Sequence, residues 1–179
     1  MNKHTGFTLV ELMITLTVVV ILLSVAVPSF RALQANNQAV TQVNLLVSTL
    51  NFARSEAVSR NATVAICPKA TASIADTTCG DNGDWANGWQ VFTDETGTAG
   101  AFDGTDTALR HFDPLPGSPT VTTTSNNIRY QGDGMKTPAG VITLALSQAD
   151  TTVSTDRCIR ISTMGQVSVH EITDTATCP

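Results

Sequence analysis

The feature that most constrains this chain is an apolar stretch near its N-terminus. Between Phe7 and Val27 lie twenty-one residues with a single charge, the carboxylate of Glu11. A helix needs about 20 predominantly apolar residues to cross the hydrocarbon core of a bilayer, so this stretch predicts a membrane-spanning helix. A secretory signal peptide fits less well, because its apolar region is roughly 7–15 residues long and ends in a small-residue cleavage site. Here Gly6 precedes the stretch instead of following it.

The carboxylate of Glu11 needs a partner inside such a helix. An ionisable side chain at the centre of a membrane helix costs about 2.5–3.5 kcal/mol on insertion scales and is usually paired. Glu11 lies about one helical turn from Phe7, whose α-amine would become a nearby cation if the chain were cut after Gly6. The amine of a neighbouring subunit could also neutralise it. The sequence therefore favours a Glu11 that is paired with an amine over an ordinary carboxylate at the membrane edge.

A known signal matches this arrangement. Residues 6–12 read Gly-Phe-Thr-Leu-Val-Glu-Leu, and Pro28 follows the apolar stretch. This combination resembles the class III signal of type IV pilins and type II secretion pseudopilins. The resemblance implies that prepilin peptidase cuts after Gly6 and that Phe7 becomes the methylated N-terminus. It also implies that Glu11 docks subunits in a filament and that Pro28 kinks the helix.

Helical periodicity continues beyond Pro28. Apolar residues recur at steps of mostly three or four, while several amide side chains, including Gln42, fall largely off this stripe. We expect one helix from Phe7 to about Ser59, with an apolar stripe that packs against a sheet. The stripe consists of Phe30, Leu33, Val40, Val43, Val47, Leu50, Ala53 and Ala57.

Short strands and turn-rich links follow the helix. We predict strands at residues 62–67, 89–94, 120–124, 127–130, 140–145, 157–163 and 166–170, and a long connection over 95–119, which is rich in Gly, Asp, Thr and Pro. The expected fold is α+β and pilin-like, with a long N-terminal membrane-spanning α-helix packed on an antiparallel β-sandwich-like head. The predicted division is a leader at 1–6, a membrane or filament-core half of the helix at 7–28, and a periplasmic head at 29–179.

Two further segments narrow the resemblance. Residues 50–61 and the tryptophan-containing strand around Trp89 are similar to the GspH/FimT family, which groups minor type IV pilins of the FimT/FimU kind with type II secretion H pseudopilins. Arg54 and Glu56 belong to this pattern, but two residues of separation do not place them face to face on a helix. We therefore assign neither of them to a site.

Four cysteines lie beyond the membrane segment. An even number in an exported domain favours disulfides over free thiols, and four cysteines allow three pairings. The nearest-neighbour pairing would join Cys67 to Cys79 and Cys158 to Cys178. Zinc or redox chemistry is disfavoured, because the chain has no Cys-x-x-Cys spacing.

The sequence indicates no catalytic residue, cofactor or metal site. The acidic loop residues could bind calcium, but their spacing is not that of an EF-hand, and Asp and Asn are common in turns. There is no Gly-x-Ser-x-Gly elbow and no phosphate-binding loop, and we interpret His111 and His170 as surface residues. The oxygen ligands considered for calcium are Asp81, Asn82, Asp84, Asp94, Glu95, Asp103 and Asp106.

DNA binding is a more specific alternative to a purely structural function. Some competence pilins similar to this group use a C-terminal Gly-Arg-x-Arg motif, and residues 165–168 here read Gly-Gln-Val-Ser, so both arginines are replaced. Arg157 and Arg160 remain nearby, and Arg129, Lys136 or Lys69 could join them in the fold. The net charge of −5 opposes binding to phosphates. We therefore rank DNA contact through Arg157 and Arg160 below a purely structural role.

The resemblance implies a non-enzymatic minor type IV pilin. It would reside in the bacterial inner membrane as a single-pass protein with a periplasmic head, and then enter a pilus. Its partners would be other pilins through the N-terminal helix, prepilin peptidase and the inner-membrane assembly platform. The first alternative is the H pseudopilin of type II secretion, entering a pseudopilus, and the second is a DNA-binding minor pilin of natural transformation.

Overall fold

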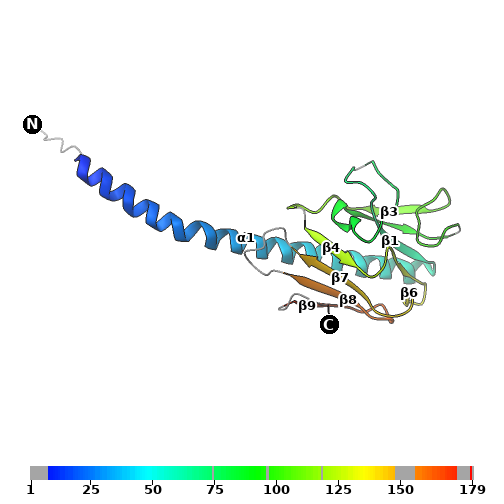
Figure 1. Cartoon of the computed structure of the whole chain (residues 1–179). Coiled ribbons are helices and arrows are strands. Elements are labelled where there is room, and N and C mark those ends of the chain that lie inside the picture. The colour runs from blue at the N-terminus through cyan, green and yellow to red at the C-terminus, as the bar shows by residue number, and fades with distance from the viewer. Residues whose placement is uncertain are drawn as a thin grey trace, which may run out of the picture.

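One long helix and two antiparallel sheets make up most of the described part of the protein (Figure 1). The structure is a computed structural model that describes residues 8–73, 75–95, 97–117, 119–147, 156–172 and 178. The N-terminal part of the helix projects away from the rest of the chain, and the strands gather around its C-terminal part. This arrangement confirms the predicted α+β class with a long helix packed on antiparallel strands.

Helix α1 runs from Leu9 to Arg60, close to the predicted bounds. Its start is capped by Thr8, whose hydroxyl oxygen accepts a hydrogen bond of 3.2 Å from the backbone N–H of Glu11. Its end is capped by Asn61 in the left-handed conformation, with a φ of 49°, which asparagine tolerates better than most residues. At 1.5 Å per residue, α1 is about 78 Å long.

The two halves of α1 have different environments. Every residue from Thr8 to Arg31 is exposed, and the first buried residue is Ala39. Small residues on the packed side, such as Ala53 and Ala57, are fully buried and let the sheets approach the helix closely. The buried residues of α1 are Ala39, Gln42, Val43, Leu46, Thr49, Leu50, Ala53 and Ala57.

Part of the predicted apolar stripe was wrong. Phe30 and Leu33 are exposed because they precede the packed part of the helix, and Val40 is 40% exposed because it faces away from the sheets. Gln42 was expected off the stripe but is only 2% exposed. It is accommodated because its amide donates a hydrogen bond of 2.7 Å to the carbonyl of Pro116.

The first sheet has five strands in the order β3-β2-β1-β5-β6. Its central strands β1 and β2 are buried on both faces, since α1 covers one face and two loops cover the other, one with Cys79 before β2 and one with Phe102 after it. The strands are β1 (Val64–Pro68), β2 (Trp89–Thr93), β3 (Thr107–His111), β5 (Ile128–Tyr130) and β6 (Lys136–Thr137).

The second sheet has four strands in the order β4-β7-β8-β9, and all of its pairings are antiparallel. Strand β7 alternates buried and half-exposed residues, so Ile142, Leu144 and Leu146 share one face and enter the core. The strands are β4 (Thr120–Thr123), β7 (Ile142–Ser147), β8 (Arg157–Ile161) and β9 (Val167–Glu171).

Three short elements departed from the prediction. Strand β3 lies inside the segment predicted as a long connection, and it was missed because it is an exposed edge strand without a run of apolar residues. Strand β6 has only two residues, which is too short for a periodic pattern. The segment Asp84–Asn87 (η1), which lies between two predicted strands, forms a 3-10 turn that buries Trp85.

Both disulfides join nearest neighbours. Cys67 is bonded to Cys79 and Cys158 to Cys178, with Cα–Cα distances of 5.5 and 5.6 Å, which lie in the usual range for disulfides. This is one of the three pairings that the sequence allows. The first bond fastens the loop that carries Cys79 to β1, and the second fastens residue 178 to β8.

Reduction of the Cys67–Cys79 bond should destabilise the head. A closed loop of this size contributes about 3 kcal/mol through the entropy of the unfolded chain. We expect the double variant Cys67→Ser/Cys79→Ser to unfold at a lower temperature in detergent micelles, followed by the fluorescence of the buried Trp85 and Trp89. Four reactive thiols in the untreated protein, or an unchanged unfolding midpoint, would contradict this assignment.

Candidate assembly interface

Residues 9–31 of α1, called here the apolar half, form the largest exposed apolar surface among the described residues. The exposed fractions of Leu9, Leu22 and Phe30 are 74%, 64% and 67%. The helix is long and apolar enough to cross a membrane by length and composition. Such a surface is unstable in water, so it must be covered by lipid or by other protein.

The hydroxyl groups in the apolar half are satisfied by the helix itself. Thr17 donates to the carbonyl of Met13 at 2.8 Å, and Ser24 donates to that of Ile21 at 2.7 Å. Thr15 and Ser29 make equivalent bonds one turn back along the helix. These groups therefore need no water, which suits an apolar environment.

Glu11 is the one ionisable group in the described chain between Thr8 and Ser29. It lies in the first turn of α1 and is exposed. Gly6 and Phe7, the residues of the predicted cleavage site, lie outside the described residues. Pro28 lies inside α1, which continues through it without interruption and curves gently in Figure 1.

Two glutamines and a tryptophan fix the packed half of α1 on the head. The side chains of Gln38 and Gln42 both donate to the backbone carbonyl of Pro116. The indole N–H of Trp89 on β2 donates to the hydroxyl of Thr49 at 3.3 Å in the buried core. Because these bonds come from the loop before β4 and from the first sheet, they hold the helix at one rotation about its axis.

Arg54 is a clamp that the sequence analysis missed. Its Nε donates to the carbonyl of Gly134 at 3.0 Å, and its Nη2 donates to that of Met164 at 3.0 Å. The first carbonyl belongs to the turn between β5 and β6, and the second to the turn between β8 and β9, so one guanidinium joins α1 to both sheets. Burial raises the pKa of the neighbouring Tyr130 hydroxyl, and the positive charge of Arg54 opposes that rise.

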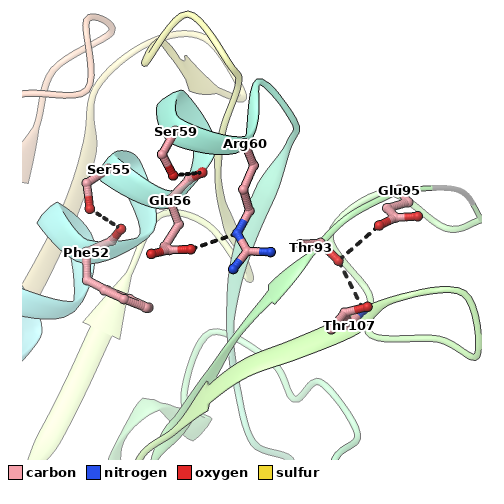
Figure 2. Close-up of polar contacts among 8 residues, drawn as sticks. All are labelled: Phe52, Ser55, Glu56, Ser59, Arg60, Thr93, Glu95 and Thr107. Atoms are coloured by element: carbon pink, nitrogen blue, oxygen red, sulfur yellow. Dashed lines mark hydrogen bonds and ion pairs between the residues drawn. The ribbon is translucent and has the colours of Figure 1, made fainter.

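Glu56, the other charge in this pattern, has a local role. Its carboxylate pairs with the Nε of Arg60 at 2.7 Å, one turn along the helix (Figure 2). Ser55 and Ser59 donate to carbonyls of the same helix at 2.8 and 3.1 Å. Exposed pairs of this kind contribute about 0.3–0.5 kcal/mol, so Glu56 supports the end of α1 without forming a site.

The two arginines considered for DNA contact do not lie together. Residues three apart on a strand point to opposite faces, and this holds for Arg157 and Arg160 on β8. The side chain of Arg157 is 16% exposed and pairs with Glu171, and its Nη2 donates to Asn36 on α1 at 3.0 Å. Arg157 therefore ties β8 to the helix, whereas Arg160 is exposed.

The other cations named for DNA contact are paired or buried. Arg129 pairs with Asp94 at 3.3 Å. Lys69 and Lys136 are 0% and 2% exposed, and Lys136 donates to the carbonyl of Pro138 at 2.5 Å. Burial lowers the pKa of Lys136. The structure thus brings no cluster of free cations together from this set.

The acidic loop residues serve as turn acceptors. Asp84 accepts the backbone N–H of Asp81 at 2.7 Å, and Asp103 accepts that of Thr105 at 2.9 Å. The hydroxyl and backbone hydrogen bonds from Thr105 lower the pKa of Asp103. Within the described ranges, no group of three or more His, Cys, Asp or Glu could hold a metal ion.

Both histidines of the head are on the surface, as predicted. His111 is at the end of edge strand β3, and His170 is on β9, with its Nε2 3.2 Å from the hydroxyl of Ser168. Neither histidine is buried beside a carboxylate in the part of the chain that the structure describes.

The fold and the apolar half together define a class of protein. A long helix that is apolar and exposed at its start, and packed on antiparallel sheets at its end, is the architecture of a pilin-like subunit: a membrane anchor joined to a soluble head.

The chain belongs to the family described as type II transport protein GspH, whose model matches residues 42–165. The prokaryotic N-terminal methylation motif matches residues 1–27. This is a family of pilins and pseudopilins, so membership implies assembly with other subunits of that kind. No curated protein matches the chain by sequence.

Two solved structures share this fold. Both are crystal structures of the type IV minor pilin FimU of Pseudomonas aeruginosa strain PAO1, each 21% identical to this chain. The form in space group P21 has a TM-score of 0.54 and is aligned over 76% of this chain and 88% of that one. The form in space group P65 has a TM-score of 0.52, with 75% and 90% covered. At this identity the likeness concerns the fold.

Loss of the Arg54 clamp should destabilise the head. Arg54→Ala removes two charge-assisted hydrogen bonds, and we expect the free energy of unfolding to fall by about 2–4 kcal/mol. Arg54→Lys should recover only part of this, because an ammonium group cannot reproduce the planar fork that spans two turns. The measurement is denaturant unfolding in detergent micelles.

Arg60→Ala is the matched control for this prediction. It removes an arginine from the same helix, but only an exposed pair with Glu56, and should cost less than about 0.5 kcal/mol. Equal effects at the two positions would show that Arg54 does not clamp the sheets.

Proposed function

We propose that the chain is a minor type IV pilin, a structural subunit that is incorporated into a pilus or primes its assembly. The apolar half of α1 carries this proposal, because it is exposed along its whole length and extends from a small head. Before assembly this half lies in the inner membrane with the head in the periplasm. On entry into a filament it exchanges lipid for the helices of neighbouring subunits, so its apolar surface never meets water.

Maturation and docking form the finer part of the proposal. Prepilin peptidase cuts after Gly6, and Phe7 becomes the methylated N-terminus. The match of the methylation motif to residues 1–27 supports this assignment. The exposed carboxylate of Glu11 then pairs with the N-terminal amine of a neighbouring subunit. This pairing stabilises the contact, because an unpaired charge in apolar surroundings is unfavourable. The other partner is the assembly platform of the inner membrane.

The second candidate function is that of an H pseudopilin in type II secretion. The description of the matched family as a type II transport protein favours it. It shares the leader, the helix and the head, so the same contacts would serve in a pseudopilus. We place the pilin first because the FimU structures share the fold and because two disulfides hold the head together.

Deletion of the gene separates the candidates. Surface pili, twitching, secreted enzymes and transformation should be scored side by side. We expect loss of pili and twitching with secretion intact. Loss of secretion alone would identify a pseudopilin. Loss of transformation with normal pili would support a DNA receptor and contradict the structural role proposed here.

Glu11→Val should leave membrane insertion intact and impair assembly, because the variant has no anion for the neighbouring amine. We expect the variant to fractionate with the membrane at normal abundance while the pilus count falls at least tenfold. Ser24→Val is the matched control, since the hydroxyl of Ser24 bonds only to its own helix and its removal should leave piliation unchanged. Normal piliation by Glu11→Val would remove the docking role.

A further inference from the structure

A polar groove lies between α1 and the β8–β9 hairpin, away from the apolar half. Its volume is about 540 Å³, and it is open to solvent. Asn51 and Arg54 contribute from the helix, while the other lining residues belong to β8, β9 and the turn between them. The groove is lined by Asn51, Arg54, Arg160, Ser162, Gln166, Val167 and Ser168.

The charge of this groove is opposite to that of the chain. Its lining holds two guanidinium groups and no carboxylate, although the chain has 15 acidic and 10 basic residues. Arg160 is exposed and makes no ion pair within the described ranges. Arg54 is held in place by its bonds to two backbone carbonyls. A guanidinium has five N–H donors, so Arg54 can also donate to a ligand in the groove.

Neutral hydrogen-bonding groups complete the lining. The amides of Asn51 and Gln166 and the hydroxyl of Ser162 can donate to or accept from a peptide backbone. The turn that carries Ser162 and Gln166 is fixed, since the backbone N–H of Gln166 donates to Ser162 Oγ at 3.1 Å and Gly165 N–H donates to the Ser162 carbonyl at 2.9 Å. The groove is therefore preformed on rigid elements.

We propose that this groove binds an acidic peptide segment of a neighbouring subunit, with one Asp or Glu carboxylate at Arg54 on the helix side and another at Arg160 on the strand side. The proposal rests on the proposed function, which places other subunits beside this head. A carboxylate accepts two parallel N–H bonds from a guanidinium, and this geometry gives such contacts both strength and direction. The groove would thus determine which neighbouring subunit binds the head and in which orientation it binds.

A nucleic acid fits the same groove less well. Phosphate backbones are bound by stripes of several cations, but Arg129 and Arg157 are already paired, and Lys69 and Lys136 are buried. The net charge of −5 also repels a polyanion. A short carboxylate-bearing segment needs only the two guanidinium groups that the groove provides.

The test uses the full chain in zwitterionic detergent micelles and a fluorescein-labelled hexapeptide of alternating Asp and Ser, read by fluorescence anisotropy. We expect saturable binding that the corresponding Asn and Ser peptide does not show. Arg160→Gln should weaken binding about tenfold, as expected for the loss of one charge-assisted contact. Gln166→Glu should weaken it similarly, because it places a carboxylate of the chain itself in the groove.

Arg60→Gln is the control, since it removes the same charge from an exposed arginine outside the groove and should leave binding unchanged. Equal effects of Arg160→Gln and Arg60→Gln would overturn the proposal. Tighter binding of a short single-stranded oligonucleotide than of the peptide, with the oligonucleotide binding lost in Arg160→Gln, would also overturn it. Because the assay needs no filament, its failure is distinct from failure of the pilin function, which the gene deletion reports.

Discussion

The need to cover the apolar half of α1 governs the rest of this structure. Burial of one large aliphatic side chain contributes about 1.5–3 kcal/mol, and the described helix presents more than a dozen of them to its surroundings without cover from its own head. No rearrangement of a head this small could bury so long a surface. The chain is therefore stable only in lipid or beside other apolar helices, and assembly with other subunits supplies the second kind of cover. Glu11 stands out within it because the nearby hydroxyl groups are satisfied by their own helix.

The second constraint is the continuity of α1 between its two environments. The helix passes through Pro28, and no break separates the exposed half from the packed half. Because Gln38 and Gln42 hold the loop at Pro116 and Arg54 holds a turn of each sheet, the orientation of the apolar half fixes the orientation of the head. A contact made by helices in the core of a filament is thus transmitted to the surface of the head, where the Arg54–Arg160 groove lies.

Much of this could be predicted from the sequence, and the rest depends on contacts between distant segments. Length and composition predicted the helix, and short runs of strand-forming residues between turn-rich links predicted most strands. Strand β3 was missed because an edge strand needs no apolar run, and Gln42 was misplaced because periodicity cannot reveal the Pro116 carbonyl that satisfies it. Arg54 bonds to two carbonyls that lie 80 and 110 positions further along the chain, and no local sequence pattern could indicate these contacts. The roles of Gly6, Phe7 and Glu11 rest on the resemblance and on the methylation motif.

Mass spectrometry of the N-terminal peptide, taken from sheared surface pili and from the membrane fraction of the same cells, is the sharpest test of this assembly role. We expect chains in the pilus fraction to begin at a methylated Phe7 and to lack residues 1–6. These chains must enter the filament with α1 intact, because the apolar half is the surface through which they contact the other subunits. Chains that keep residues 1–6, or processed chains that remain in the membrane while pili form without them, would contradict the claim that this helix is an assembly element.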